Sequence, residues 1–334
     1  MKILFYIDSP ATYQFNFFEN LKKKNEVFVL YKNNFSQNHK LKFKKKKWMF
    51  FLRGNNKLFI KKILKKINPN IIIIGGYKLN ISNKYLKKNN IKKFYWLERV
   101  YNKNIVKNLL RNFYLKITLK NADGIFAIGK EATKFYKSFN SKVYNLPYSI
   151  NFQKKINYYQ IPKFLFVGQM IERKGINEIL NVIEKINTNK CKFTFIGEGP
   201  LSKDIIRISK EKKNVKYYRF KNKISLNKIY MQNNILLLPS RYDGWGVVII
   251  EAMARGMALI TSKNVGAYKE YLIHNYNGRI FDLKKNSLDK QIIFYMNNIN
   301  KIKLFGKRNI KIFKSNLCNC SKAVSKINEI IRLR

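Results

Sequence analysis

Two carboxylates, Asp243 and Glu251, lie eight positions apart in a stretch that also holds Gly244 and Gly246. Glycines in a loop let the backbone come close to a ligand, and N–H groups at a helix N-terminus attract anions such as phosphate. A carboxylate repels phosphate but accepts hydrogen bonds from the hydroxyls of a ribose or a hexose. A site that offers backbone amides to a diphosphate and carboxylates to hydroxyls is suited to bind a nucleotide-sugar. The alternative is an ordinary strand–helix–strand unit with acids on its surface.

The sequence around these carboxylates predicts a strand, a glycine loop and a helix in that order. Ile235–Leu238 is a continuous apolar run, as in a buried strand of a parallel sheet. A helix of about ten residues is expected between Gly246 and Arg255. Gly256 stands where a helix C-terminal glycine belongs, and Ala258–Thr261 begins the next strand. The glycine loop is therefore expected at the carboxyl end of a buried strand.

The segment DGWGVVIIEAMARGMALITS, followed by GAYKE, resembles the Glu-x7-Glu region of retaining, family-four glycosyltransferases of the GT-B fold. The resemblance implies that Glu251 holds the nucleotide ribose and that Asp243 contacts the transferred sugar. The sequence has Asp243 where the family usually has Glu, which shortens the reach by one methylene. Backbone amides that touch sugar and phosphate would come from Gly244, Trp245, Gly246 and Val247.

A second motif, FLFVGQMIERKG, resembles the family's Gly-Arg-x4-Lys-Gly loop and begins at the end of another predicted strand. Gly168 and Lys174 match it, and the resemblance implies that Lys174 neutralises the donor diphosphate as it leaves. A cation suits that position because the leaving group gains negative charge in the transition state. Gln169 replaces the family's Arg. Either Arg173 compensates for that loss or one donor contact is missing.

A third motif is the turn Gly197-Glu198-Gly199, which follows a predicted strand and resembles the family's Gly-x-Gly turn beside the nucleotide. On the acceptor side, Tyr77 follows two glycines at the end of a buried strand, where α/β folds place ligands. Glu98 directly follows another strand and resembles an acceptor-side acid of related sugar transferases. The alternative for Glu98 is a surface ion pair.

The composition is strongly basic, with a formal net charge of +51 over 334 residues. Only 12 of the 69 basic residues are Arg, whereas proteins that read nucleic acid use Arg for bidentate contacts. A coding bias towards Lys, Asn, Ile, Phe and Tyr accounts for much of this charge. A lysine surface that favours anionic lipid or acidic polymers is the functional alternative.

Residues 40–66 combine the run Lys44–Lys47 with the aromatic residues Trp48, Phe50 and Phe51. This pattern fits a basic amphipathic segment that docks on an anionic membrane, and also aromatic stacking on nucleic acid. The simplest interpretation is a solvated helix face over an ordinary core. We expect possible contact with an anionic membrane and no specific nucleic-acid partner.

The cysteines and histidines argue against a metal centre. Cys191, Cys318 and Cys320 form no metal pattern, and His39 and His274 are the only histidines. No Asp-x-Asp motif is visible, so cationic side chains are expected to replace a metal, and no cofactor is expected. No apolar run reaches the length of a membrane helix. A cytoplasmic protein is expected, with peripheral binding to the inner face of the cytoplasmic membrane as a possibility.

These observations together predict an α/β protein of the GT-B class, with two Rossmann-like doubly wound domains facing across a cleft. Residues 1–150 would bind the acceptor, residues 151–320 the nucleotide-sugar, and a helix over 321–334 would pack back on the first domain. The expected activity is retaining transfer of a sugar from a UDP-, GDP- or ADP-linked donor to a glycan or lipid-linked acceptor, in surface polysaccharide or lipopolysaccharide synthesis. The alternatives are a GT-B-like sugar-nucleotide epimerase and a basic nucleic-acid-binding protein.

Overall fold

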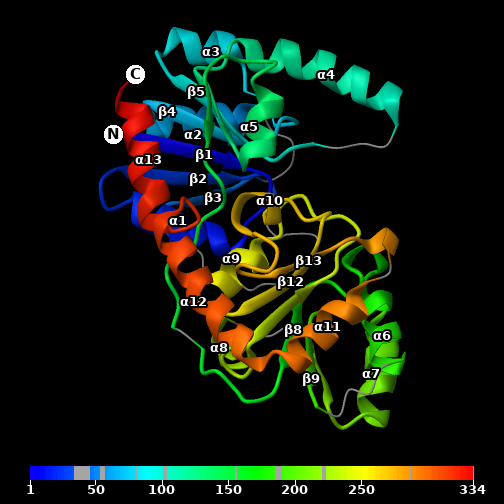
Figure 1. Ribbon diagram of the computed structural model, residues 1–334. Coiled ribbons are helices and arrows are strands. Elements are labelled where there is room, and N and C mark those ends of the chain that lie inside the picture. The colour runs from blue at the N-terminus through cyan, green and yellow to red at the C-terminus, as the bar shows by residue number, and fades with distance from the viewer. Residues whose placement is uncertain are drawn as a thin grey trace. The chain divides into compact units, whose positions relative to one another are not determined.

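The computed structural model divides the chain into two compact units (Figure 1). The first unit consists of Met1–Ile150 and Cys320–Arg334, and the second of Asn151–Asn319. The structure describes residues 1–33, 46–52, 57–79, 81–100, 104–154, 156–185, 190–219, 223–285 and 287–333.

The first unit is built on a seven-stranded parallel sheet with the order β3-β2-β1-β4-β5-β6-β7. Its central strands are almost continuously apolar, and their side chains are buried on both faces because helices cover the sheet. The strands are β1 Lys2–Ile7, β2 Glu26–Tyr31, β3 Met49–Phe51, β4 Ile71–Gly75, β5 Lys92–Leu97, β6 Gly124–Ala127 and β7 Val143–Asn145. The helices are α1 Thr12–Leu21, α2 Lys57–Ile67, α3 Asn83–Lys88, α4 Ile105–Lys120, α5 Lys130–Tyr136 and α13 Cys320–Arg332.

The C-terminal helix α13 belongs to the first unit although the whole second unit precedes it in the chain. It packs on α1, and the Asn25 side chain donates a hydrogen bond of 2.8 Å to the side-chain oxygen of Asn328. The Cys320 amide donates to the carbonyl of Ile150, where the first unit ends. The chain therefore crosses between the units twice.

The aromatic residues singled out in segment 40–66 are part of the core rather than of an exposed helix face: Trp48 is buried, and Phe50 and Phe51 are half-buried. Phe51 stacks on Tyr31 with ring centroids 5.3 Å apart. The reason is that Met49–Phe51 forms strand β3 at the edge of the sheet, so its side chains complete the core. Lys44 and Lys45 lie outside the described residues. Within the described ranges, no helix is long and apolar enough to cross a membrane.

The second unit has a six-stranded parallel sheet with the order β10-β9-β8-β11-β12-β13. The strands are β8 Lys163–Val167, β9 Lys192–Ile196, β10 Val215–Tyr218, β11 Ile235–Leu238, β12 Ala258–Ser262 and β13 Arg279–Phe281. The helical elements are η1 Glu172–Lys174, α6 Ile176–Lys185, α7 Ser202–Glu211, α8 Lys223–Met231, α9 Val247–Met253, α10 Tyr268–Tyr271, η2 Leu283–Lys285, α11 Leu288–Asn297 and α12 Ile299–Ser315.

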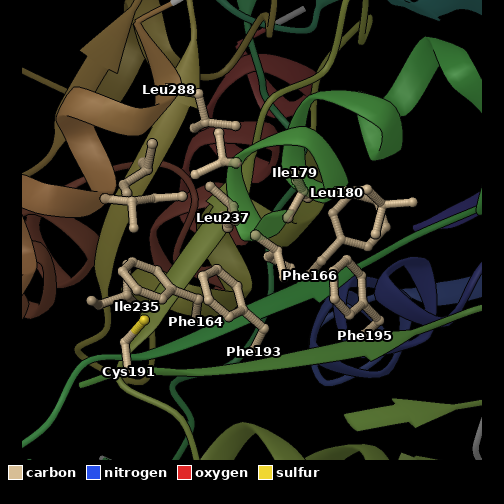
Figure 2. Close-up of a cluster of buried hydrophobic side chains, with 14 of the residues drawn as sticks. Phe164, Phe166, Ile179, Leu180, Cys191, Phe193, Phe195, Ile235, Leu237 and Leu288 are labelled. Atoms are coloured by element: carbon tan, nitrogen blue, oxygen red, sulfur yellow. The ribbon is translucent and has the colours of Figure 1, made fainter. Parts of the chain in front are cut away.

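One face of this sheet carries a core of aromatic and aliphatic side chains (Figure 2). Phe164 of β8 stacks on Phe193 of β9 with ring centroids 5.1 Å apart. Ile179 from α6 and Leu288 from α11 reach the same cluster, so these two helices are held against the sheet by apolar burial. The core fixes the strands whose ends carry the candidate site.

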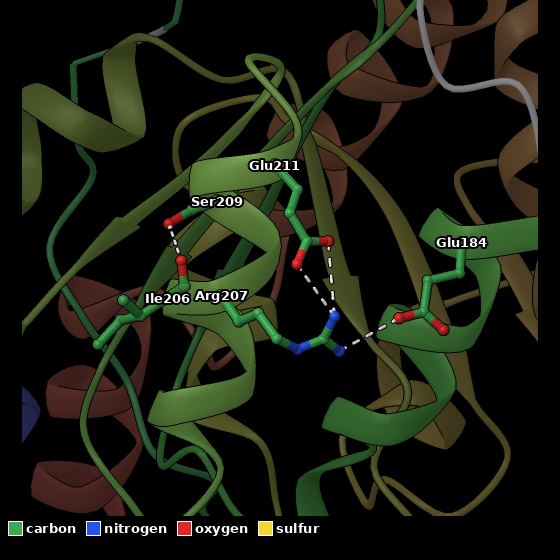
Figure 3. Close-up of polar contacts among 5 residues, drawn as sticks. All are labelled: Glu184, Ile206, Arg207, Ser209 and Glu211. Carbon is green, nitrogen blue, oxygen red and sulfur yellow. Dashed lines mark hydrogen bonds and ion pairs between the residues drawn. The ribbon is translucent and has the colours of Figure 1, made fainter.

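An exposed ion pair joins the two helices α6 and α7 on the surface of the second unit (Figure 3). Arg207 lies 3.2 Å from Glu211 and 3.5 Å from Glu184. All three side chains are well exposed, so water screens the attraction and the pair adds little to stability.

Neighbouring strands β8 and β11 mark the point where the order of the second sheet reverses. Along the chain, β8 is followed by β9 on one side, whereas β11 is followed by β12 on the other. In open α/β sheets, ligands bind beyond the carboxyl ends of the strands at such a switch point. The loops after β8 and β11 hold the residues singled out from the sequence.

Candidate donor and acceptor sites

The glycine loops after β8 and β9 are paired through their backbones. The Gly168 amide donates to the Ile196 carbonyl, and the Met170 amide donates to the Glu198 carbonyl, each at 3.0 Å. Gly197 has φ 148°, and a Cβ there would lie 1.8 Å from the Gly168 oxygen. A Cβ at Gly199 would lie 2.5 Å from the Met170 oxygen. Only glycine permits this close approach, which brings Gly168, Gly197 and Gly199 together.

A second close approach fixes the short helix η1 against the loop after β11. Gly175 ends η1 with φ 78°, and a Cβ there would lie 2.1 Å from the Pro239 oxygen. The Arg241 amide also donates to the Arg173 carbonyl at 2.9 Å. Lys174, the last residue of η1, is thereby held beside the loop that carries Asp243.

Lys174 and Asp243 form an ion pair in which Nζ lies 2.5 Å from Oδ2. Their side chains are only 15% and 14% exposed. The family resemblance implies that Lys174 contacts a diphosphate and Asp243 a sugar, and nothing in the sequence pattern indicated that the two side chains touch each other. Partial burial strengthens the attraction between them, because less water screens it.

Backbone hydrogen bonds and one further cation complete the surroundings of Asp243. Its amide donates to the Asn264 carbonyl, and its carbonyl accepts from the Gly266 amide, both at 3.0 Å. Arg173 is exposed, and its guanidinium donates to the Tyr242 carbonyl at 2.7 Å. Lys174 and Arg173 therefore both contact this loop. Gln169, which replaces the family's Arg, lies half-buried in the loop after β8.

The loop from Gly244 to Val247 is shaped by its contacts with residues 265–267. The Ala267 amide donates to the Trp245 carbonyl at 2.8 Å, and a Cβ at Gly266 would lie 2.2 Å from the Gly244 oxygen. Gly246 has φ 82° and caps α9, whose first residue is Val247. The Trp245 ring is buried. Any contact of this loop with a ligand would therefore use backbone more readily than the indole.

Helix α9 is shorter than the sequence predicted. It ends at Met253, and a turn follows in which Gly256 has φ 76°. The predicted limit at Arg255 is two residues too long. The left-handed backbone at Gly256 ends the helix and directs the chain into β12. Glu251 still lies on the helix, one turn after Val247.

Glu251 is held by residues that the sequence analysis did not identify. Its carboxylate oxygen Oε2 accepts a hydrogen bond of 2.8 Å from the Tyr230 hydroxyl. Burial, and then the charge of Glu251, raises the pKa of Tyr230 well above its ordinary value. Arg255 stacks on the Tyr230 ring at 4.1 Å and donates to the Glu251 carbonyl at 2.8 Å. Tyr230 lies outside the motifs that the sequence analysis identified, so no local pattern pointed to it.

In the first unit, Glu98 belongs to a hydrogen-bonded group of side chains. Burial, followed by the Glu98 charge, raises the pKa of Tyr148, which is hydrogen-bonded to both Glu98 and Tyr13. The Tyr136 hydroxyl donates to the Glu98 carbonyl at 2.7 Å. These contacts set Glu98 apart from the neighbouring Arg99, whose exposed side chain pairs with Glu131.

Tyr77 follows β4, the strand next to β5, after which Glu98 stands. Both residues thus lie at the carboxyl edge of the first sheet. The Tyr77 carbonyl accepts a hydrogen bond of 3.4 Å from the Tyr114 hydroxyl of α4. In the described part of the chain, no three His, Cys, Asp or Glu side chains form a group that could hold a metal ion.

Sequence comparison places this region in a known family. Residues 149–311 match the family model of the glycosyl transferases group 1. The uncharacterized glycosyltransferase MJ1178 of Methanocaldococcus jannaschii is 28% identical over 212 residues, which cover 61% of this chain and 58% of that relative. The first curated relatives are covered over only 34% to 58% of their own length. The family match therefore covers most of the second unit.

Solved structures extend the likeness to both units. Anabaena HepE in complex with UDP aligns over 100% of both chains with a TM-score of 0.80 and 14% identity, and another HepE structure holds UDP-glucose. The lipopolysaccharide outer core galactosyltransferase WaaB aligns over 99% of each chain with a TM-score of 0.70 and 16% identity. At such identities the likeness establishes the fold. The two parallel sheets are those of a GT-B protein, as the sequence predicted.

Proposed function

We propose that this protein is a retaining, metal-independent glycosyltransferase that moves a sugar from a nucleotide-diphosphate donor to a glycan or a lipid-linked acceptor. The observation that carries the proposal is the Lys174–Asp243 pair at the carboxyl edge of the second sheet. It sets a cation suited to a diphosphate directly beside a carboxylate suited to sugar hydroxyls. The family match over residues 149–311 supports the same assignment.

The nucleoside part of the donor is assigned to Glu251 and the paired glycine loops. Tyr230 holds one oxygen of the Glu251 carboxylate, which restricts its rotation and prepares it to accept from ribose hydroxyls. The neighbouring loops after β8 and β9 expose backbone that a nucleotide can approach closely. The residues concerned are Gly168, Gln169, Gly197 and Gly199. A UDP-linked donor is favoured, because UDP and UDP-glucose occupy the structurally similar HepE.

Transfer breaks the bond between the anomeric carbon of the sugar and the diphosphate oxygen, and forms a bond to the acceptor oxygen. The departing diphosphate keeps the electron pair of the broken bond, and Lys174 and Arg173 offset its growing negative charge. The acceptor hydroxyl attacks on the face from which the diphosphate leaves, and the leaving phosphate takes its proton. Asp243 accepts hydrogen bonds from the sugar. Amides of Gly244 to Val247 contact the sugar and the phosphate.

The acceptor is assigned to the first unit, with Glu98 and Tyr77 as contact residues. The Tyr148 hydrogen bond orients Glu98, and a fixed carboxylate is suited to hold a sugar hydroxyl. A lipid-linked or polysaccharide acceptor is favoured by the fold shared with WaaB, a lipopolysaccharide galactosyltransferase. A peripheral position at a membrane would give the enzyme access to such an acceptor.

The proposal is tested by donor screening followed by product analysis. Thermal unfolding is first measured with UDP-, GDP- and ADP-sugars, because a ligand that binds only the native state raises the midpoint. The stabilising donor is then incubated with candidate acceptors, and NMR determines the configuration of the new glycosidic bond. Transfer with the donor's configuration supports the proposal. Inversion, or conversion of the donor to an epimer without an acceptor, would refute it.

A further inference from the structure

Helix α4 exposes a continuous row of large apolar side chains to solvent. Ile105 is 75% exposed and Phe113 is 68% exposed. Seven of the exposed large apolar residues of the described chain lie on this one helix: Ile105, Val106, Leu109, Leu110, Phe113, Tyr114 and Ile117. Their spacing of three and four residues places them on one side of the helix. Exposed apolar patches of this kind mark interaction surfaces.

The packing of α4 on its own unit explains only a small part of its apolar sequence. Leu115 and Leu119 are its buried residues, and both lie in the second half of the helix. Figure 1 shows the first half extending away from the rest of the first unit. An ordinary surface helix turns its apolar side to the core and its polar side to water. Here the larger apolar side faces outward, so it requires another occupant.

The charges of α4 favour an anionic occupant. The helix carries Lys107, Arg111, Lys116 and Lys120 and no Asp or Glu. Lys116 and Lys120 are exposed on the same side of the helix, at its C-terminal end, where long stems can lie along an apolar phase while the ammonium groups reach its polar boundary. A second copy is disfavoured as the occupant, because pairing two such helices would bring like charges together.

We propose that α4 is the membrane-docking element of this protein, and that its exposed side inserts into the interface of an anionic lipid bilayer. The helix has 16 residues, fewer than the roughly 20 needed to span a bilayer. It therefore lies along the surface, with Phe113 and its apolar neighbours at the level of the acyl chains and the lysines at the phosphates.

The position of α4 gives this docking a consequence for the reaction. Tyr114, on α4, donates a hydrogen bond to the Tyr77 carbonyl, and the two rings meet edge to face with centroids 6.4 Å apart. Docking through α4 therefore brings the Tyr77 end of the first sheet to the bilayer. At the bilayer, a lipid-linked acceptor would be within reach of Tyr77. This consequence rests on the proposed function.

Vesicle co-sedimentation tests the docking independently of catalysis. Wild-type protein is mixed with vesicles of phosphatidylcholine alone or with phosphatidylglycerol, and compared with the triple variant Leu110→Ser, Phe113→Ser and Ile117→Ser. We expect the variant to partition at least about tenfold less onto the anionic vesicles, since three inserted side chains are lost. The matched control is Leu58→Ser, which removes an exposed apolar residue of the lysine-rich helix α2 and should bind as wild type does. Equal binding by the triple variant would overturn the proposal.

A second variant reports insertion directly. Trp48, Trp96 and Trp245 are all buried, so the indole introduced by Phe113→Trp is the exposed one, and its emission should shift to the blue with anionic vesicles. If the variant bound the vesicles without a shift of its tryptophan emission, the membrane contact would lie elsewhere on the protein. Sedimentation velocity on the lipid-free protein tests the rival occupant: a dimer that the triple variant abolishes would assign the surface to a second copy. Donor binding by the triple variant should remain unchanged, so loss of docking and loss of the donor site are distinguished.

Discussion

Lys174 Nζ lies 2.5 Å from Asp243 Oδ2, although the two residues are 69 positions apart in the chain. Gly175 makes this contact possible by letting η1 approach the backbone at Pro239. Each charge neutralises the other before a donor arrives, so neither is left partly buried without a partner. A bound nucleotide-sugar would offer each residue a new partner. Its diphosphate would pair with the lysine, and its hydroxyls would donate to the carboxylate. The pair is thus suited to exchange partners when the donor enters.

Replacing Lys174 with Ala should lower kcat much more than it raises the donor KM. The negative charge of the diphosphate grows towards the transition state, so the cation contributes more there than in the ground state. Steady-state kinetics at varied donor concentration measure the split. Lys326→Ala is the control, because it removes a lysine from an exposed ion pair with Glu329 in the first unit. Wild-type turnover in a folded Lys174→Ala enzyme would remove Lys174 from the reaction.

Tyr230→Phe should weaken donor binding without abolishing it. The change removes the hydrogen bond that holds the Glu251 carboxylate. A bond to a charged group contributes about 1.5–3 kcal/mol, and only a part of it is transmitted to donor binding because the donor does not touch Tyr230 directly in the proposed site. The dissociation constant should rise by up to about tenfold. Tyr159→Phe is the matched control, since the Tyr159 hydroxyl bonds the Met231 carbonyl of the same helix α8. An effect of equal size in both variants would point to stability of α8 rather than to Glu251.

Gly197→Ala should destabilise the protein strongly, whereas Gly168→Ala should be tolerated. A Cβ at 197 would collide with the Gly168 oxygen at 1.8 Å, and its φ of 148° is unfavourable for alanine. We expect a loss of about 2–4 kcal/mol in the free energy of unfolding from clash and backbone strain. At 168 the nearest atom would be the Phe166 ring at 3.4 Å, an ordinary contact. Denaturant titration compares the two, and equal stability would contradict the loop geometry.

His274 should make the stability of the second unit fall as the pH drops below neutrality. Partial desolvation of the imidazole, and then the charge of Arg279, lowers the pKa of His274 below its ordinary 6.5. Between the folded-state pKa and 6.5 the unfolded chain binds more protons, so the free energy of unfolding rises with pH in that window.

The His274→Asn variant measures this contribution. An asparagine oxygen can accept from the Ile280 amide, which bonds Nδ1 of His274 at 3.0 Å in the wild type. Denaturant titrations between pH 7 and pH 5.5 should give a shallower pH dependence for the variant. An unchanged slope would show that other groups carry the acid sensitivity.

The sequence was sufficient to predict those strands that are continuous apolar runs. Ile235–Leu238 has the predicted limits, since a proline follows the run, and the next strand begins at Ala258 as predicted. Strand β3 was missed because its three residues follow a lysine run that suggested a surface helix. The exposed apolar side of α4 could not be foreseen either, because spacing gives the apolar face of a helix but not what covers it.

The candidate site was predictable in its members but not in its contacts. The glycine motifs located the loops after β8, β9 and β11, because a tight turn at a strand end leaves a strong local pattern. The pairing of Lys174 with Asp243, and of Tyr230 with Glu251, depends on which strands are neighbours. Strand order is a property of the folded sheet and leaves no signal at either residue.

The most direct test of the donor site is calorimetric titration with the stabilising nucleotide-sugar. The titration compares three proteins: the wild type, Glu251→Gln and Glu211→Gln. Glu211 is the exposed partner of Arg207 and serves as the matched control. A charged hydrogen bond to a hydroxyl contributes about 1.5–3 kcal/mol, so Glu251→Gln should weaken the donor by roughly 10- to 150-fold. The control should bind as wild type does. Unchanged donor affinity in a folded Glu251→Gln protein, or no nucleotide-sugar binding by the wild type, would contradict the proposed donor site.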